Sequence, residues 1–94
     1  MRYHVKYYSG VSENIKHLSP ELKRLVTSGI DEISKNPYLG LPLDDELKGF
    51  RKYRVNRYRI VYEIHSEKKE IYIVRIDHRL TIYERLYEML KKRL

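Results

Sequence analysis

The stretch from Lys48 to Arg59 carries six positive charges and no negative one. The cations are Lys48, Arg51, Lys52, Arg54, Arg57 and Arg59. Apolar and polar residues alternate along this stretch, which predicts a β-hairpin. If Asn56-Arg57 forms its turn, Arg54 faces Arg59 across the strand pair, where like charges repel each other. A hairpin that brings these two arginines together is therefore expected to hold an anion against that surface.

A second polar group, at residues 77–83, follows the last predicted strand. Pairing about a turn at 66–69 places Arg59 opposite Ile76, so Arg79 and Tyr83 are expected to leave the sheet near Arg59. The sequence thereby predicts one concave, cationic surface formed by Lys52, Arg54, Arg59, Arg79 and Tyr83.

This surface suits a reaction that needs no nucleophile from the protein. RNA is cleaved when its own 2′-hydroxyl attacks the adjacent phosphate, while the enzyme positions the strand, moves protons and stabilises negative charge. Arginine and lysine stabilise that charge, and a tyrosine stacks on a base. Taken singly, Lys52 and Arg54 fit solvent-facing strand residues better, and Arg79 and Tyr83 equally fit a strand end and a helix start.

Other cations and one histidine are candidates for binding RNA around this surface: Lys48, Arg51, Arg57 and His78. Among them, His78 has the side chain best suited to proton transfer near neutral pH. The alternative for His78 is a structural role at the end of its strand.

Several classes of site are excluded by composition and spacing. The chain has no cysteine, which excludes disulfides, a thiol nucleophile and a thiolate metal site. Its four histidines lack metal-ligand spacing, and there is no phosphate-binding loop or nucleophile elbow. No metal or cofactor is expected. A formal net charge of +7 and a pI of about 9.6 favour polyanions or a strongly acidic protein as partners.

The elements that must position these residues follow from periodicity. A strand at 2–8 precedes helical segments at 11–18 and 20–35, with Ser19 as N-cap, Pro20 at the first position and Asn36-Pro37 as the stop. After a loop at 38–48, strands are predicted at 50–55, 58–65 and 70–77, and an amphipathic helix at 82–94. The helix-facing side of the sheet is predicted to carry Tyr53, Val55, Ile60, Tyr62, Ile64, Ile71 and Ile73.

This order predicts a small α+β domain over residues 1–94, with an N-terminal strand, an αα-hairpin, a three-stranded antiparallel meander and a C-terminal helix. No apolar run is long enough to cross a bilayer, and the N-terminus lacks a signal-peptide pattern. The protein is expected in the cytoplasm, with no membrane partner.

Two segments carry a family resemblance over most of the chain. The stretch 49–64, which contains Tyr58-Arg-Ile-Val-Tyr62, and the stretch 71–79 with Tyr83 beyond it resemble the RelE/ParE superfamily of toxins from type II toxin–antitoxin systems. The RelE branch cleaves messenger RNA within the ribosomal A site, so the resemblance implies a metal-independent endoribonuclease that acts on the ribosome. It also implies a cognate small acidic antitoxin as partner, with DNA contacted only through that antitoxin.

The resemblance also implies roles for individual residues. Lys52 or Arg54 would assist deprotonation of the 2′-hydroxyl, Arg59 would stabilise the crowded phosphate, Arg79 would serve the leaving oxygen and Tyr83 would stack on the nucleotide. Arg54 stands where the best-known members have lysine, and arginine is a poor general base because it stays protonated. That difference moves a base role toward Lys52 or leaves Arg54 with electrostatic help alone.

Two further functions stay open from the sequence. A ParE-like toxin would bind and inhibit DNA gyrase without cleaving anything, and such members typically lack the full set of cations and the late tyrosine. A degenerate toxin would act only within an antitoxin complex on DNA. Whichever of these functions the toxin has, we expect the antitoxin to contact or displace the helix at 82–94, because apolar residues occupy two faces of this helix. The alternative is that this helix packs fully on the sheet while the antitoxin wraps elsewhere.

Overall fold

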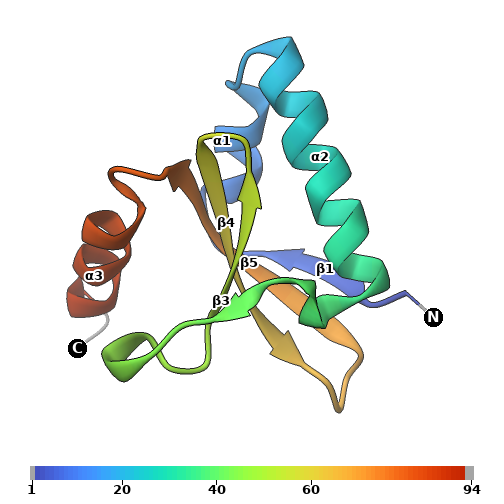
Figure 1. The fold of residues 1–94 in the computed structure, drawn as a ribbon, viewed down its shortest axis with the longest axis vertical. Coiled ribbons are helices and arrows are strands. Elements are labelled where there is room, and N and C mark those ends of the chain that lie inside the picture. Colours follow the sequence, from blue (N-terminus) through green and yellow to red (C-terminus); the bar gives the residue numbers. More distant parts are fainter. Residues whose placement is uncertain (1, 93–94) are drawn as a thin grey trace.

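The computed structural model describes residues 2–92 and shows an α+β fold built around one five-stranded sheet (Figure 1). The strands are β1 (His4–Tyr7), β2 (Leu41–Pro42), β3 (Arg51–Val55), β4 (Tyr58–His65) and β5 (Glu70–His78). Their order across the sheet is β1-β5-β4-β3-β2, with β1 parallel to β5 and the other pairs antiparallel. The predicted fold class is confirmed.

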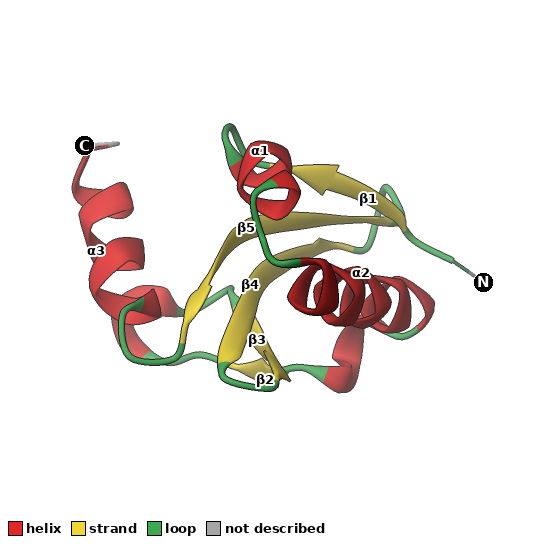
Figure 2. Ribbon diagram, turned by 90° about the horizontal axis from the view of Figure 1, so that it is seen from above, coloured by secondary structure: helices red, strands yellow, loops and turns green. Residues whose placement is uncertain are grey.

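The helices are α1 (Val11–Lys16), α2 (Pro20–Lys35) and α3 (Ile82–Lys92). Ser19 caps α2 as predicted, because its side-chain oxygen accepts a hydrogen bond from the Leu22 N–H at 3.4 Å. Residues of α1 and α2 share one core with the sheet, and Figure 2 shows α3 standing apart from both helices, near the other end of the molecule. Residues 93–94, which the prediction assigned to the last helix, lie outside the described part. No helix within residues 2–92 is long and apolar enough to cross a membrane.

The sheet separates two apolar cores. The larger one packs against α1 and α2 and contains the side chains that parity assigned to the helix-facing side: Val55, Ile60, Tyr62, Ile71 and Ile73 are buried, and Tyr53 and Ile64 pack beside them. The smaller one joins Val61 and Val74 of the sheet to Ile82 and Leu86 of α3. Lys52, Arg54 and Arg59 lie on this second face, opposite the first core.

The predicted loop at 38–48 is more ordered than expected. It contains two 3₁₀ turns, at Pro37–Leu39 and Asp45–Leu47, and the short strand β2 pairs with the start of β3. Phe50, which was predicted to begin a strand, is buried in the second core. The prediction of a loop missed β2, because this segment is fixed by tertiary contacts and carries little periodicity of its own.

A β-bulge in β5 changes the predicted pairing of Arg59. Tyr62 pairs with Ile73 while Val61 pairs with Arg75, so Val74 has no partner across the ladder. Beyond this point the register moves by one residue, and Arg59 lies opposite Asp77 instead of the expected Ile76. Val74 faces the second core, as alternation after Ile73 requires, and the extra residue of the bulge lets Ile76 face the first core together with Ile73.

Candidate nucleic-acid interface

Three of the predicted cations line one depression, on the face of the β3–β4 hairpin that is opposite the first core. Lys52, Arg54 and Arg59 surround a hollow of about 390 Å³ together with Tyr53 and with two leucines from the segment before β3. The hairpin turns at Asn56-Arg57, and Arg54 pairs directly with Arg59 as the sequence predicted. Because no acidic residue lines the hollow, its electrostatic character is that of an anion site.

Lys52 connects this depression to α3. Its Nζ lies 5.8 Å from the centroid of the Tyr83 ring, a cation–π arrangement. Tyr83 is in the first turn of α3, whose buried residues Ile82 and Leu86 fix the helix on the second core. The expected proximity of Tyr83 to the hairpin cations is therefore found, and Lys52 is the residue that it contacts.

Arg59 is held in place by the backbone of its own hairpin. Its Nη1 donates to the carbonyl of Asn56 at 3.2 Å and to the carbonyl of Tyr58 at 2.9 Å. Asp77, its cross-strand neighbour, is bound instead by the Nε of Arg75. Within residues 2–92, Lys52, Arg54 and Arg59 make no ion pair with any carboxylate. Their charges remain available to an anion from outside.

Arg79 lies at the same end of the sheet as the hairpin turn. Its backbone N–H donates to the carbonyl of Arg57 at 2.7 Å, which ties the exit from β5 to the turn between β3 and β4. The Arg79 side chain is exposed and has no hydrogen-bond or ion-pair partner among the described residues. The structure thus places Arg79 near the hairpin tip without bringing its guanidinium into the depression.

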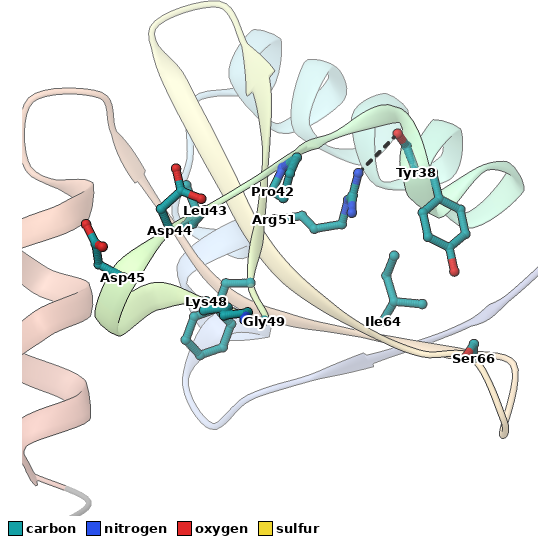
Figure 3. A pocket seen from close by; sticks show the side chains of 11 residues that line it. Tyr38, Pro42, Leu43, Asp44, Asp45, Lys48, Gly49, Arg51, Ile64 and Ser66 are labelled. Carbon is teal, nitrogen blue, oxygen red and sulfur yellow. Dashed lines mark hydrogen bonds between the residues drawn. The ribbon is translucent and has the colours of Figure 1, made fainter.

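The remaining candidates lie elsewhere. Arg51 is on the opposite face from Lys52 and donates from Nε and Nη2 to the carbonyl of Gly40, at 3.0 and 2.8 Å. It lines another hollow, of about 860 Å³, with Tyr38 and Lys48, where Figure 3 shows its guanidinium reaching the Tyr38 carbonyl. Arg51 therefore holds the segment Tyr38–Gly40 in place. Lys48 lies near Arg51 and not near Lys52.

His78 and Arg57 line a third hollow, against the N-terminal turn of α2. The His78 ring packs edge-on against Tyr58, with centroids 5.7 Å apart, and its Nδ1 accepts a hydrogen bond from the Leu80 N–H at 3.1 Å. The contacts of His78 are those of a side chain that shapes the turn after β5.

Sequence reasoning missed the wall of the depression. Leu39 and Leu41 line it beside the cations, and Leu41 pairs directly with Lys52 across β2 and β3. Both leucines are exposed. The signal in the sequence was the apolar run around Gly40 and Pro42, inside a segment taken for a loop.

A buried tyrosine holds this wall. The Tyr62 hydroxyl, which is fully buried, donates to the Pro37 carbonyl at 2.5 Å and accepts from the Gly40 N–H at 3.0 Å. A Cβ on Gly40 would lie 2.4 Å from that hydroxyl and 2.7 Å from the Lys52 carbonyl, so only glycine fits there. Burial raises the pKa of Tyr62 above its usual 10.0, against the opposing effects of the Gly40 hydrogen bond and the Arg51 charge.

The described residues contain no group of three or more histidine and acidic side chains that would hold a metal ion.

Known proteins are similar to this chain in sequence and in fold. A family model described as the ParE toxin of a type II toxin–antitoxin system, parDE, matches residues 4–83. Toxin RelG of Mycobacterium tuberculosis is 33% identical over 87 residues, which cover 90% of this chain and 100% of RelG. The toxin–antitoxin complex RelBE2 from M. tuberculosis matches with a TM-score of 0.75 at 29% identity, over 83% of this chain and 99% of that one. A mutant of E. coli toxin RelE in the free state matches with a TM-score of 0.77 at 16% identity, over 100% and 99%, a likeness of fold alone.

Proposed function

This chain belongs to the RelE/ParE superfamily of toxins from type II toxin–antitoxin systems, and we propose that it is a ribosome-dependent endoribonuclease. Its substrate would be messenger RNA in the ribosomal A site. The observation that carries the proposal is the hollow lined by Lys52, Arg54 and Arg59 without a carboxylate, with Tyr83 against Lys52. Three uncompensated cations on a rigid sheet suit a reaction whose transition state gathers charge on phosphate oxygens.

The proposed reaction is a transesterification within the RNA. The 2′-oxygen loses its proton and forms a bond to the adjacent phosphorus, the bond from phosphorus to the 5′-oxygen breaks, and that oxygen takes up a proton. The products are a 2′,3′-cyclic phosphate and a 5′-hydroxyl, with no oxidation or reduction. Lys52 or Arg54 would assist removal of the 2′-proton, and Arg59 would bind the phosphate oxygens. Arg79 would serve the leaving oxygen and Tyr83 would stack on a base.

A cognate antitoxin is the proposed inhibitory partner, and contact with DNA would come only through it. Relatives have been solved as complexes of RelE with RelB from Pyrococcus horikoshii and from E. coli. The net charge of +7 on this chain favours an acidic partner.

A second function, inhibition of DNA gyrase by binding alone, is favoured by one observation. The family model that matches residues 4–83 is described as a ParE toxin. A ParE-like toxin would use the same fold without needing Lys52, Arg54 and Arg59 to meet around one hollow.

Translation in vitro with primer extension on the message separates the two functions, with a gyrase supercoiling assay run in parallel. We expect cuts in ribosome-bound messages, no cuts in the same RNA without ribosomes, and unchanged supercoiling. If supercoiling fails while translation continues on intact messages, the chain is a ParE-like toxin and the nuclease proposal is wrong.

A further inference from the structure

We infer that Leu39 and Leu41 form a subsite for a nucleobase of the RNA, beside the cations that take its phosphate. The inference rests on the proposed function in that the ligand is RNA. The two leucines are 45% and 63% exposed, although they lie in an ordered segment that is fixed by buried hydrogen bonds. Exposed apolar side chains in a rigid, hollowed place indicate a binding surface.

The geometry couples this wall to the cations. Leu41 pairs with Lys52, so the two side chains leave the same face of adjacent strands. Leu39 and Leu41 share the hollow of about 390 Å³ with Lys52, Arg54 and Arg59. This volume is near the lower end of small-ligand pockets, which span about 300–1,000 Å³. A hollow of that size, apolar on one side and cationic on the other, matches one nucleotide with its phosphate.

The segment that carries the wall is built to stay in place. Tyr62 bonds Pro37 and Gly40, and Arg51 bonds the Gly40 carbonyl through two nitrogens. These contacts lie on the opposite face of the sheet from Lys52, so they hold the wall without occupying the hollow. Arg51 and Tyr62 are therefore positioning residues for Leu39 and Leu41.

A protein segment fits this place less well than RNA. An extended peptide would add to the edge of the sheet through main-chain hydrogen bonds. The edge strand β2 has only two residues, and one of them, Pro42, has no N–H to donate. The Gly40 N–H and carbonyl next to it are already bonded to Tyr62 and Arg51. The edge therefore offers little to a strand, while the hollow offers three cations to a phosphate.

The test measures binding of a short single-stranded RNA to the full-length free protein by fluorescence anisotropy. The probe carries 2′-O-methyl groups so that it cannot be cut, and a matched set carries an abasic site at one position at a time. Wild type is compared with Leu39→Ser, Leu41→Ser and the double variant. The control is Tyr7→Ser, which removes an exposed apolar side chain from β1 at the other edge of the sheet. Thermal unfolding of each variant confirms that it is folded.

We expect wild type to bind the intact probe about tenfold more tightly than one of the abasic probes, a difference that corresponds to about 1.4 kcal/mol. In the double leucine variant the intact and abasic probes should bind equally, and Tyr7→Ser should behave as wild type. Equal binding of all probes by wild type, or a leucine effect that is the same for intact and abasic RNA, would overturn the inference. The inference would also be overturned if the leucine variants bound every RNA probe as wild type does and, in a parallel binding assay, lost affinity for the antitoxin, since the wall would then be a protein contact. Failure of the proposed nuclease function is seen separately, as uncut messages in the translation assay.

Discussion

At the scale of single residues, Arg59 combines two roles. Its Nη1 bonds two carbonyls of the hairpin turn, while its charge faces Arg54 and the hollow. The sequence alone suggested only the repulsion, which predicts that removal of Arg59 leaves the fold equally or slightly more stable. The structure adds two hydrogen bonds that partly offset that gain, each worth about 0.5–1.5 kcal/mol.

We expect Arg59→Ala to lower the rate of message cleavage by about 10²–10³, the usual loss when one oriented donor is removed from a developing oxyanion. The free energy of unfolding should change by less than about 1 kcal/mol, because lost hydrogen bonds and relieved repulsion oppose each other. Cleavage on ribosomes and urea unfolding check the two parts. Arg24→Ala, which removes the same charge from the exposed face of α2, is the control. A folded Arg59→Ala protein that cuts at the normal rate would remove Arg59 from the site.

Tyr62→Phe should destabilise the protein by about 1–3 kcal/mol, because the Pro37 carbonyl and the Gly40 N–H would both lose a buried partner. Tyr87→Phe, on the exposed side of α3, should change the free energy of unfolding by much less. Denaturant unfolding of both variants is the measurement. If the two variants lost the same free energy of unfolding, the hydrogen bonds of the Tyr62 hydroxyl would not stabilise the loop.

The same tyrosine predicts how stability depends on alkaline pH. Because burial raises the pKa of Tyr62 above 10.0, the unfolded chain gives up this proton before the folded chain does. The stabilisation is therefore complete below about pH 10 and is lost as the pH rises through the folded-state pKa. Tyr7 shifts in the same direction for the same cause. Urea unfolding between pH 8 and 11 should show the decline in wild type and a smaller one in Tyr62→Phe; identical profiles would contradict the assignment to Tyr62.

At the scale of elements, α3 forms a separate part of the packing. Ile82 and Leu86 are its buried residues, and they lie in the second core with Val61 and Val74, away from the core that α1 and α2 cover. Met89 and Leu90 pack at the edge of that core as predicted, and Tyr87 stays exposed. A partner able to replace α3 would open only the smaller core.

We therefore expect hydrogen exchange in residues 82–92 to change when the cognate antitoxin binds. Exchange would slow if the antitoxin covers α3 and would quicken if it displaces the helix, and either change would reach Tyr83 and through it Lys52. The amides of β4, in the middle of the sheet, serve as the internal reference. Unchanged protection across α3 in the complex would show that the antitoxin wraps elsewhere.

The elements differ in how well the sequence could predict them. The alternation in β3 and in most of β4 gave the turn, the pairing of Arg54 with Arg59 and the side of the sheet that faces α1 and α2. The bulge in β5 was missed, although the consecutive Ile73 and Val74 break the alternation at that point. The short strand β2 was missed because its position is decided by Tyr62 and Arg51, which are distant in sequence, and no local pattern reports such contacts.

The sequence predicted some residues of the candidate site and missed others. Lys52, Arg54 and Arg59 were found because two adjacent strands carry them at known spacing. Leu39 and Leu41 were not, since an exposed leucine in a loop gives no sign of what lies beside it. Alternation along β3 already places Arg51 on the face opposite Lys52, but nothing in the sequence indicates that Arg51 binds the Gly40 carbonyl.

At the scale of the whole molecule, the net charge of +7 should make RNA binding strongly dependent on salt. For single strands the slope of log affinity against log salt is about −0.7 per neutralised phosphate, so Arg54→Ala should make the slope shallower by about that amount. Arg24→Ala should weaken binding slightly and leave the slope unchanged. Titrations of the uncleavable RNA at several salt concentrations give both slopes, and equal changes in the two variants would mean that the charge acts only in bulk.

A toxin released from its antitoxin has to reach its target as a dispersed molecule. Sheet edges are where folded proteins begin to aggregate, because unpaired strands recruit further strands from neighbouring molecules. Here the edge beside the cations ends in a strand of two residues that closes with Pro42. A growing fibril would find almost no template on that side, and the repelling charges of Lys52 and Arg54 stand next to it. The feature that leaves little room for a protein strand beside the candidate site thus also protects the unbound protein against self-assembly through the same edge.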